Sequence, residues 1–411
     1  MMRGVFIGAG ASYEVGMPLV WEFTQTLREN ILKRLDSKLF NFETDDELKS
    51  FFIEILSNED LHYEQIVGLL EKKHIEDRAN NQRILGVIVQ LIECIQLLLL
   101  EEQSNTLKFL SEKIKDYYGI KSLINQERVL NIFSLNHDIV FEEILDFYKI
   151  PYKDGFYKRE TNYNNIAKFK AVTSFELENG DLDFFKPNEY GINLIKLHGS
   201  LDVFAAEDRN LFLKSYGETS FVGSNYAEIR KVEDRNREIL QRDGVRTTNE
   251  LCVHDRSGEL QFLRRSLLSG AHKFKGLFDQ IIPASLLQFF KQQLNIIDQL
   301  TVIGYSFGDE HINDALKQWL ECESRTIVVY DPYRSDIPDE FDNYRDQFTL
   351  IKGGLTDYFL KYDSSQESWV TESKREMLNT VRDNLKSRRL GKKLTKNPDD
   401  IYGAPPLDVN P

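Results

Sequence analysis

The stretch Val5-Phe6-Ile7-Gly8-Ala9-Gly10-Ala11-Ser12 decides the fold, because an apolar strand must turn there into a helix. Glycine has no Cβ, so the backbone at Gly8 and Gly10 can adopt steep dihedral angles and approach a ligand closely. The helix that follows offers unpaired N–H groups and the positive end of its dipole to a phosphate. The stretch therefore predicts a nucleotide-binding turn, although small-residue turns also occur for packing alone.

Length and composition indicate an ordinary globular protein. The 411 residues are 41% hydrophobic and 29% charged, which allows two domains or one domain with large insertions. The net charge of −14 argues against a protein that coats nucleic acid through bulk electrostatics. The chain has three cysteines, Cys94, Cys252 and Cys322, and they form no Cys-x-x-Cys pair. Neither a zinc ribbon nor a disulfide framework is therefore expected. We expect a cytoplasmic protein without a signal peptide.

Beyond the opening stretch, apolar strands alternate with helices, and the strands end in polar residues. In open α/β sheets, ligands bind beyond the carboxyl ends of the parallel strands. The pattern predicts a Rossmann-like, doubly wound, mostly parallel sheet whose ligand-binding edge gathers residues from distant segments. The expected strands, each followed by its polar segment, are 129–135 with Asn136-His137-Asp138, 192–197 with His198-Gly199-Ser200, 300–303 with Gly304-Tyr305-Ser306-Phe307-Gly308-Asp309, and 326–330 with Asp331.

Each polar strand end also has a purely structural interpretation. Asp138 can cap the helix that follows it, and His198 can bond a nearby carbonyl group instead of acting as a base. Ser306 and Asp309 are placed to cap the next helix, whereas Asp331 can bind a ribose hydroxyl or start a turn. The sequence leaves these alternatives open.

A metal site is not expected. Asp309, His311 and Asn313 are close together along the chain, but their spacing is not that of a metal-ligand set. We therefore predict a site without a metal ion.

The remaining segments divide the chain into parts. Residues 36–119 contain long helical segments with few glycines or prolines and are expected to form a large helical insertion. The nucleotide-binding domain then comprises residues 1–35 and 120–335, with 202–275 as a polar lid, second small domain or partner surface. Residues 336–411 form a C-terminal extension with a helix near 368–389 and a basic, proline-bearing tail.

The most apolar run of the chain extends from Ile84 to Leu100. It contains Gln90, Glu93 and Gln96 at three-residue spacing, which places a polar stripe along one side of a helix. The run is short for a membrane span and carries a charge near its centre. We expect a core or subunit-interface helix and no membrane contact.

Several blocks of the chain resemble the bacterial sirtuin-like family in order and spacing. They are Gly8-Ala9-Gly10-Ala11-Ser12, Asn136-x-Asp138, His198-Gly199 and the segment 304–313, and the resemblance covers roughly residues 1–335. It implies a Rossmann-type domain that binds NAD, with Asn136 and His198 near the nicotinamide ribose. The residues expected to bind NAD are Gly8, Ala9, Gly10, Ala11, Ser12, Asp138, Gly304, Ser306, Asp309 and Asp331.

The chemistry expected at this site is cleavage of the nicotinamide–ribose bond. Tyr13 stands where the dehydrogenase fingerprint needs a third glycine, so hydride transfer is disfavoured. Because the nicotinamide leaves as a neutral molecule, cleavage needs no general acid. It needs a polar group such as Asn136 to orient the ribose or a water, and a base such as His198.

Water is the expected acceptor, because this chain lacks the four-cysteine zinc module of deacylating sirtuins. The expected function is therefore NAD+ hydrolysis to nicotinamide and ADP-ribose, in what the resemblance implies is an effector of bacterial antiphage defence. The alternatives are a non-catalytic NAD- or ADP-ribose-binding scaffold subunit, and a protein deacylase or ADP-ribosyltransferase.

Assembly is expected to regulate the activity, since an unregulated NAD hydrolase is toxic to its own cell. The resemblance implies a homo-oligomer and a partner such as a HerA-type DNA-translocating ATPase or an Argonaute-like protein. The helix at Ile84 to Leu100 and the basic tail are the expected contacts. Direct nucleic-acid binding is expected only through that tail.

Overall fold

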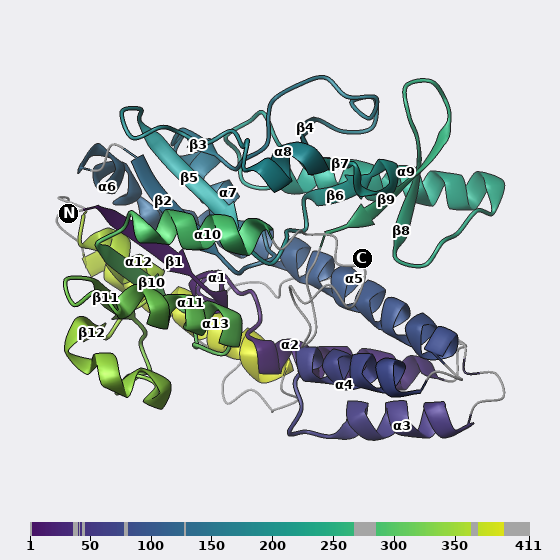
Figure 1. Cartoon of the computed structure of the whole chain (residues 1–411), viewed down its shortest axis with the longest axis horizontal. Helices are drawn as coiled ribbons and strands as arrows, with labels where there is room; N and C mark the ends of the chain where they lie inside the picture. The colour runs from purple at the N-terminus through teal and green to yellow at the C-terminus, as the bar shows by residue number, and fades with distance from the viewer. Residues whose placement is uncertain are drawn as a thin grey trace.

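The computed structural model describes residues 2–35, 40, 42, 46–77, 81–126, 129–266, 285–362 and 369–389. Within these ranges the strands form a seven-stranded sheet, in the order β12-β11-β10-β1-β2-β5-β3, and a five-stranded sheet (Figure 1). All pairs of the seven-stranded sheet are parallel. Its strands are β1 (Arg3–Ile7), β2 (Val129–Ser134), β3 (Tyr152–Lys153), β5 (Gly191–Lys196), β10 (Gln299–Ile303), β11 (Thr326–Tyr330) and β12 (Phe348–Ile351).

The order of the strands confirms the predicted Rossmann-like, doubly wound sheet. The chain starts at β1 in the middle, builds β2 and β5 on one side, and then crosses to β10 and β11 on the other side. The winding direction thus reverses between β1 and β10. In open α/β sheets, the crevice at such a reversal is where ligands bind.

Both faces of this sheet are buried, as the unbroken apolar strands predict. Val5 and Ile7 belong to one hydrophobic cluster, and Phe6, which points the opposite way, belongs to another. The first cluster includes residues of the short helix η2 (Ile114–Tyr117), α6 (Ile120–Gln126), α7 (Val140–Phe147) and α12 (Leu355–Leu360). The second includes residues of α10 (Ser285–Asn295) and α11 (Glu310–Leu320).

The expected helical insertion consists of α3 (Asp46–Ser57), α4 (Tyr63–Glu76) and α5 (Asn81–Lys113), which lie at the lower right of Figure 1. A third hydrophobic cluster joins them. Helix α2 (Val20–Arg34) contributes Phe23, Leu27 and Ile31 to this cluster, although the sequence placed α2 with the sheet domain. The packing of the insertion therefore begins before residue 36.

Helix α5 contains the apolar run that starts at Ile84. By length and composition the helix could cross a membrane, but 44% of its most apolar window is buried inside the protein. The prediction of a polar stripe along one side of this helix is wrong at Gln96. This side chain faces the protein interior and is only 1% exposed. The run supplies Ile84, Leu91 and Ile95 to the third cluster, as expected of a core helix.

The polar segment after residue 202 forms part of a second, antiparallel sheet in the order β4-β7-β6-β9-β8. Strand β4 of this sheet comes from an earlier part of the chain, and the choice among lid, second small domain and partner surface stays a prediction. Residues 267–275 of the expected insertion lie outside the described residues. The elements are β4 (Phe169–Thr173), α8 (Ser174–Asn179), β6 (Val203–Ala206), β7 (Leu211–Ser215), α9 (Ser224–Asp243), β8 (Glu250–His254) and β9 (Leu260–Arg265).

The C-terminal extension begins with the short helix η4 (Asp339–Gln347) and continues through β12 and α12. The helix predicted near 368–389 is present as α13 (Trp369–Arg389). The part of the basic tail beyond Arg389 lies outside the described residues.

Candidate functional site

The carboxyl ends of the central strands lie in one row across the sheet. Ile7 of β1 pairs with Ser134 of β2 and with Ile303 of β10. Ser134 pairs with Lys196 of β5, and Ile303 pairs with Tyr330 of β11. The polar residues that follow these strands therefore share one edge, as the sequence predicts.

Backbone hydrogen bonds continue past the strand ends and join the loops to one another. Leu135 N donates to Ile7 O over 3.2 Å, and Leu197 N donates to Ser134 O over 2.9 Å. Leu201 N donates to His137 O over 2.9 Å. The loop that carries Asn136 is thus held between the glycine turn and the loop that carries His198.

Three of the predicted site residues form one buried cluster. Asn136 Nδ2 donates to Ser12 Oγ over 2.9 Å, and Ser12 Oγ donates to Asp138 Oδ1 over 2.9 Å. Asp138 Oδ1 also accepts from Val140 N over 3.0 Å, so the expected contact with the following helix exists as well. Burial raises the pKa of Asp138, whereas Lys196 and these hydrogen bonds oppose the rise.

Lys196 contacts the loop that carries this cluster. The sequence did not predict this residue as part of the site. Its Nζ donates to the carbonyl oxygen of Asp138 and lies 3.2 Å from Glu142 Oε1. Both side chains of this ion pair are buried. The available signal was a lysine at the last position of a buried strand.

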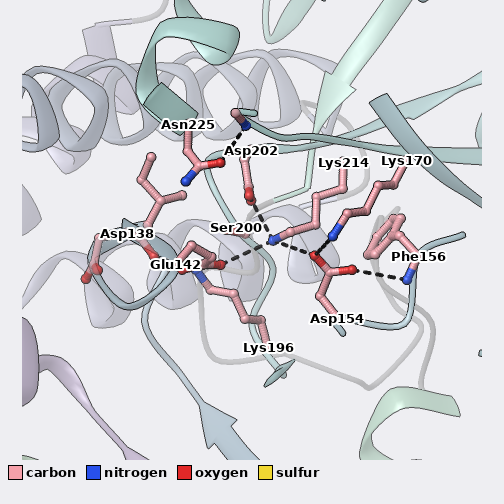
Figure 2. A network of polar contacts seen from close by, with 12 residues as sticks. Asp138, Glu142, Asp154, Phe156, Lys170, Lys196, Ser200, Asp202, Lys214 and Asn225 are labelled. Carbon is pink, nitrogen blue, oxygen red and sulfur yellow. Dashed lines mark hydrogen bonds and ion pairs between the residues drawn. The ribbon is translucent and has the colours of Figure 1, made fainter. Parts of the chain in front are cut away.

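The ion pair belongs to a buried network centred on Lys214 (Figure 2). Lys214 Nζ lies 2.8 Å from Asp202 Oδ2, 3.2 Å from Glu142 Oε1 and 4.0 Å from Asp154 Oδ2. Burial alone lowers the pKa of Lys214, but these carboxylates raise it well above its ordinary value. The network joins β7 of the antiparallel sheet to the Asp138 loop of the parallel sheet.

The two glycine turns pack directly against each other at the reversal point of the sheet. Gly8 N donates to Ile303 O over 3.0 Å, and Gly10 N donates to Gly304 O over 2.8 Å. A Cβ on Gly10 would lie 2.7 Å from the Cα of Gly304, which itself has a φ of 63°. The close approach that requires glycine is therefore one between two backbone segments of the protein.

This packing corrects one expectation about the opening turn. The helix after the turn is expected to offer unpaired N–H groups, but Gly10 N and Ala11 N donate to Gly304 O and to Gly8 O. Helix α1 (Ala9–Tyr13) has only five residues. Among the predicted residues of this turn, Ala9 is exposed at the edge.

The second turn also differs from its expected capping pattern. Asp309 is the N-cap residue of α11, but its side chain makes no capping hydrogen bond. The hydroxyl of Tyr305 instead accepts from Asp309 N over 3.2 Å and donates to Asn313 Oδ1 over 2.9 Å. Ser306 is exposed, and its carbonyl oxygen accepts from Arg334 Nη2 over 3.1 Å.

Asp331 starts a turn. Its Oδ1 accepts from Tyr333 N over 2.8 Å and from Arg334 N over 3.0 Å. Its Oδ2 lies 3.6 Å from Arg334 Nε. The structure thus shows the turn interpretation, and a contact between Asp331 and a ribose stays a prediction.

His198 meets a second histidine that the sequence analysis left without a role. Nε2 of His198 lies 3.1 Å from Nε2 of His311 and 3.9 Å from Oδ1 of Asp309. His198 is buried, and the ligand atoms of the three residues all lie within 4.8 Å of one another. Asp309 and His311 are neighbours in the sequence, whereas His198 comes from a distant strand end, so the spacing along the chain does not reveal the three residues as a group.

The first residues of α4 approach this edge of the sheet. Burial raises the pKa of Tyr63, and the nearby carboxylates of Glu64 and Asp309 raise it further. Tyr63 N donates to Thr24 Oγ1 over 3.0 Å, which ties α4 to α2. No sequence pattern pointed to Tyr63, because an aromatic residue at a helix start is typical of ordinary packing.

Comparison with known proteins gives structural neighbours only. No protein-family model and no curated protein matches the chain. A Sir2 homologue in complex with NAD is 14% identical, with a TM-score of 0.35, over 93% of this chain and 90% of that one. A Sir2 homologue mutant in complex with 2'-O-acetyl ADP-ribose is 11% identical, with a TM-score of 0.39, over 96% and 94%. At these values the likenesses carry no argument about activity, so any assignment rests on the site residues.

Proposed function

We propose that this chain hydrolyses NAD+ at the nicotinamide–ribose bond and releases nicotinamide and ADP-ribose. The supporting observation is that Asn136 and His198 occupy equivalent positions just after the neighbouring strands β2 and β5. Each follows the paired residues Ser134 and Lys196 by two positions, and both side chains are buried at the reversal edge of the sheet. This edge is where a doubly wound sheet binds its ligand.

Asn136 is suited to orient the ribose or the attacking water. An amide has two N–H donors and an oxygen acceptor, and the bond to Ser12 Oγ uses one donor. That bond fixes the rotation of the side chain, so the amide oxygen and the second N–H keep a defined direction. A polar group that is already oriented lowers the entropic cost of reaching the transition state.

His198 is suited to take the proton of the water. The 3.1 Å contact with His311 requires that one of the two rings present an unprotonated nitrogen to the other. A neutral imidazole has one nitrogen that can accept a proton, which is the property that a base at this position needs. Since nicotinamide leaves as a neutral molecule, this base and the oriented water suffice for hydrolysis.

The test is nicotinamide release from NAD+ by the full chain, measured by chromatography. We expect His198→Ala to lower the rate by about 10²–10⁴-fold, the usual contribution of a general base. Asn136→Ala is expected to show a comparable loss, while His254→Ala on the outer strand β8 serves as the matched control. Each variant is compared with wild type by circular dichroism to confirm folding.

The alternatives predict different results in the same assay. A wild-type protein that binds NAD+ but releases no nicotinamide would support the scaffold function instead. A strict requirement for an acylated peptide would support a deacylase.

The defence role, the homo-oligomer and a HerA-type or Argonaute-like partner rest on the sequence resemblance and stay predictions. Light scattering coupled to size-exclusion chromatography tests the assembly. A monomer that is fully active without any partner would contradict this regulation.

A further inference from the structure

We propose that His198, His311 and Asp309 form a binding site for a divalent transition-metal ion of the Zn2+ class. The three side chains converge although His198 and His311 are 113 residues apart in sequence. Their ligand atoms lie within 4.8 Å of one another, so small movements of the side chains would bring all three to one ion. The site lies on the edge proposed to cleave NAD+, but its existence does not depend on that activity.

The distance between the two histidines fits a shared ion. Zinc–nitrogen bonds of about 2.05 Å, with nitrogen atoms 3.1 Å apart, subtend roughly 100° at the metal, close to a tetrahedral angle. The contact between the two Nε2 atoms thus already has the spacing of two imidazole ligands on one ion.

Asp309 provides the third ligand after a small movement. Its Oδ1 lies 3.9 Å from His198 Nε2, and a shift of about half an ångström brings that distance to the tetrahedral value. The side chain is 21% exposed and stands at the N-cap position of α11, beside the two histidines.

The donor set selects the class of metal. Two imidazoles with one carboxylate suit Zn2+, Co2+ or Ni2+, whereas Mg2+ and Ca2+ prefer oxygen ligands throughout. Three protein ligands also leave a coordination position for water, as in zinc sites that are accessible to small molecules.

Metal binding has a consequence that rests on the proposed function. An ion on His198 Nε2 occupies the electron pair that a base uses to accept a proton. Metal binding and NAD+ hydrolysis then exclude each other at this nitrogen. We expect Zn2+ to inhibit the hydrolase reversibly and EDTA to restore its activity.

The direct test uses the metal alone, without NAD+. The full chain, freed of metal with EDTA and then dialysed, is titrated with Co2+ and followed by visible d–d absorption. Zn2+ binding is measured by calorimetry. We expect one ion per chain, and loss of a ligand in His311→Ala or Asp309→Ala should weaken Zn2+ binding by at least about 100-fold, since second-shell changes alone cost 10–100-fold.

Controls separate this proposal from the proposed function. His254→Ala removes a histidine elsewhere and should bind Co2+ as wild type does, and circular dichroism checks the fold of every variant. Absence of Co2+ and Zn2+ binding, or unchanged binding by His311→Ala, overturns the metal site even if the protein hydrolyses NAD+. Binding that requires all three residues in a protein inactive on NAD+ supports the metal site and contradicts only the hydrolase.

Discussion

Asn136 Nδ2 donates a hydrogen bond to Ser12 Oγ over 2.9 Å, across a sequence separation of 124 residues. The same hydroxyl donates to Asp138 Oδ1, so Ser12 is the shared partner of both polar residues at the end of β2. The hydroxyl cannot rotate without breaking one of these bonds. Ser12 is therefore a positioning residue for Asn136 and Asp138.

Ser12→Ala should lower kcat for NAD+ hydrolysis by roughly 10-fold with little change in KM, because the Asn136 amide loses its fixed orientation. The lost hydrogen bonds should also lower the free energy of unfolding by about 1–2 kcal/mol. Steady-state kinetics and urea unfolding measure the two effects. Ser111→Ala, which changes an exposed helical serine bonded only locally, is the control. An unchanged kcat in Ser12→Ala would contradict the positioning role.

Lys214→Met should strongly destabilise the protein. It leaves the buried carboxylates of Glu142 and Asp202 without their shared ammonium group, and a loss of about 3–5 kcal/mol is expected. Lys168→Met removes the surface ion pair with Glu218 and should cost much less, because both side chains are exposed to solvent. Urea denaturation compares the two variants. Similar losses in both would show that the buried network is not structurally important.

Gly304→Ala should disrupt the contact between the two turns. The added Cβ would lie 2.4 Å from Ala11 N, at a backbone φ of 63° that disfavours alanine. We expect a loss of about 2–5 kcal/mol of unfolding free energy. Gly86→Ala is the matched control, because nothing lies within 4 Å of its Cβ on helix α5, and it should stabilise by about 0.5–1 kcal/mol. Thermal unfolding gives both values, and a neutral Gly304→Ala would contradict this packing argument.

Glu143 should make stability depend on pH. Burial raises its pKa to about 7, although the N–H groups of Gly223, Tyr226 and Asn225 at the start of α9 oppose the rise. Between its unfolded pKa of about 4.3 and this folded value, the folded chain binds more protons than the unfolded chain, so stability falls as pH rises.

The measurement compares wild type with Glu143→Gln between pH 8 and pH 5. Wild type should gain about 2–3 kcal/mol relative to this variant as the pH is lowered, because the buried carboxylate becomes neutral. Glu178→Gln, at an exposed position of α8, should follow wild type across the range. A constant difference between wild type and Glu143→Gln would contradict the prediction.

Much of the fold was predictable because unbroken apolar strands and their breaks are local signals. The segment Thr326-Ile327-Val328-Val329-Tyr330 is strand β11 over the predicted residues, and Ser285 begins the predicted helix α10. The antiparallel sheet was not predicted, because strands such as β9 carry polar residues among their apolar ones, and Arg265 of β9 is buried in an ion pair with Glu233. Its strand β4 also comes from before β5, which no local pattern indicates.

The sequence by itself determined the parallel, doubly wound sheet and the strand ends that carry Asn136, Asp138 and His198, because strand periodicity and polar breaks depend on neighbouring residues alone. Only the tertiary structure decided what these residues contact. Ser12 lies against Asn136, and His311 lies against His198, because strand pairing aligns ends that are distant in the chain. The tertiary structure also showed why Gly10 and Gly304 must be glycine: a Cβ on either residue would collide with the backbone of the other. Backbone packing between two turns leaves no signal in the sequence of either turn alone.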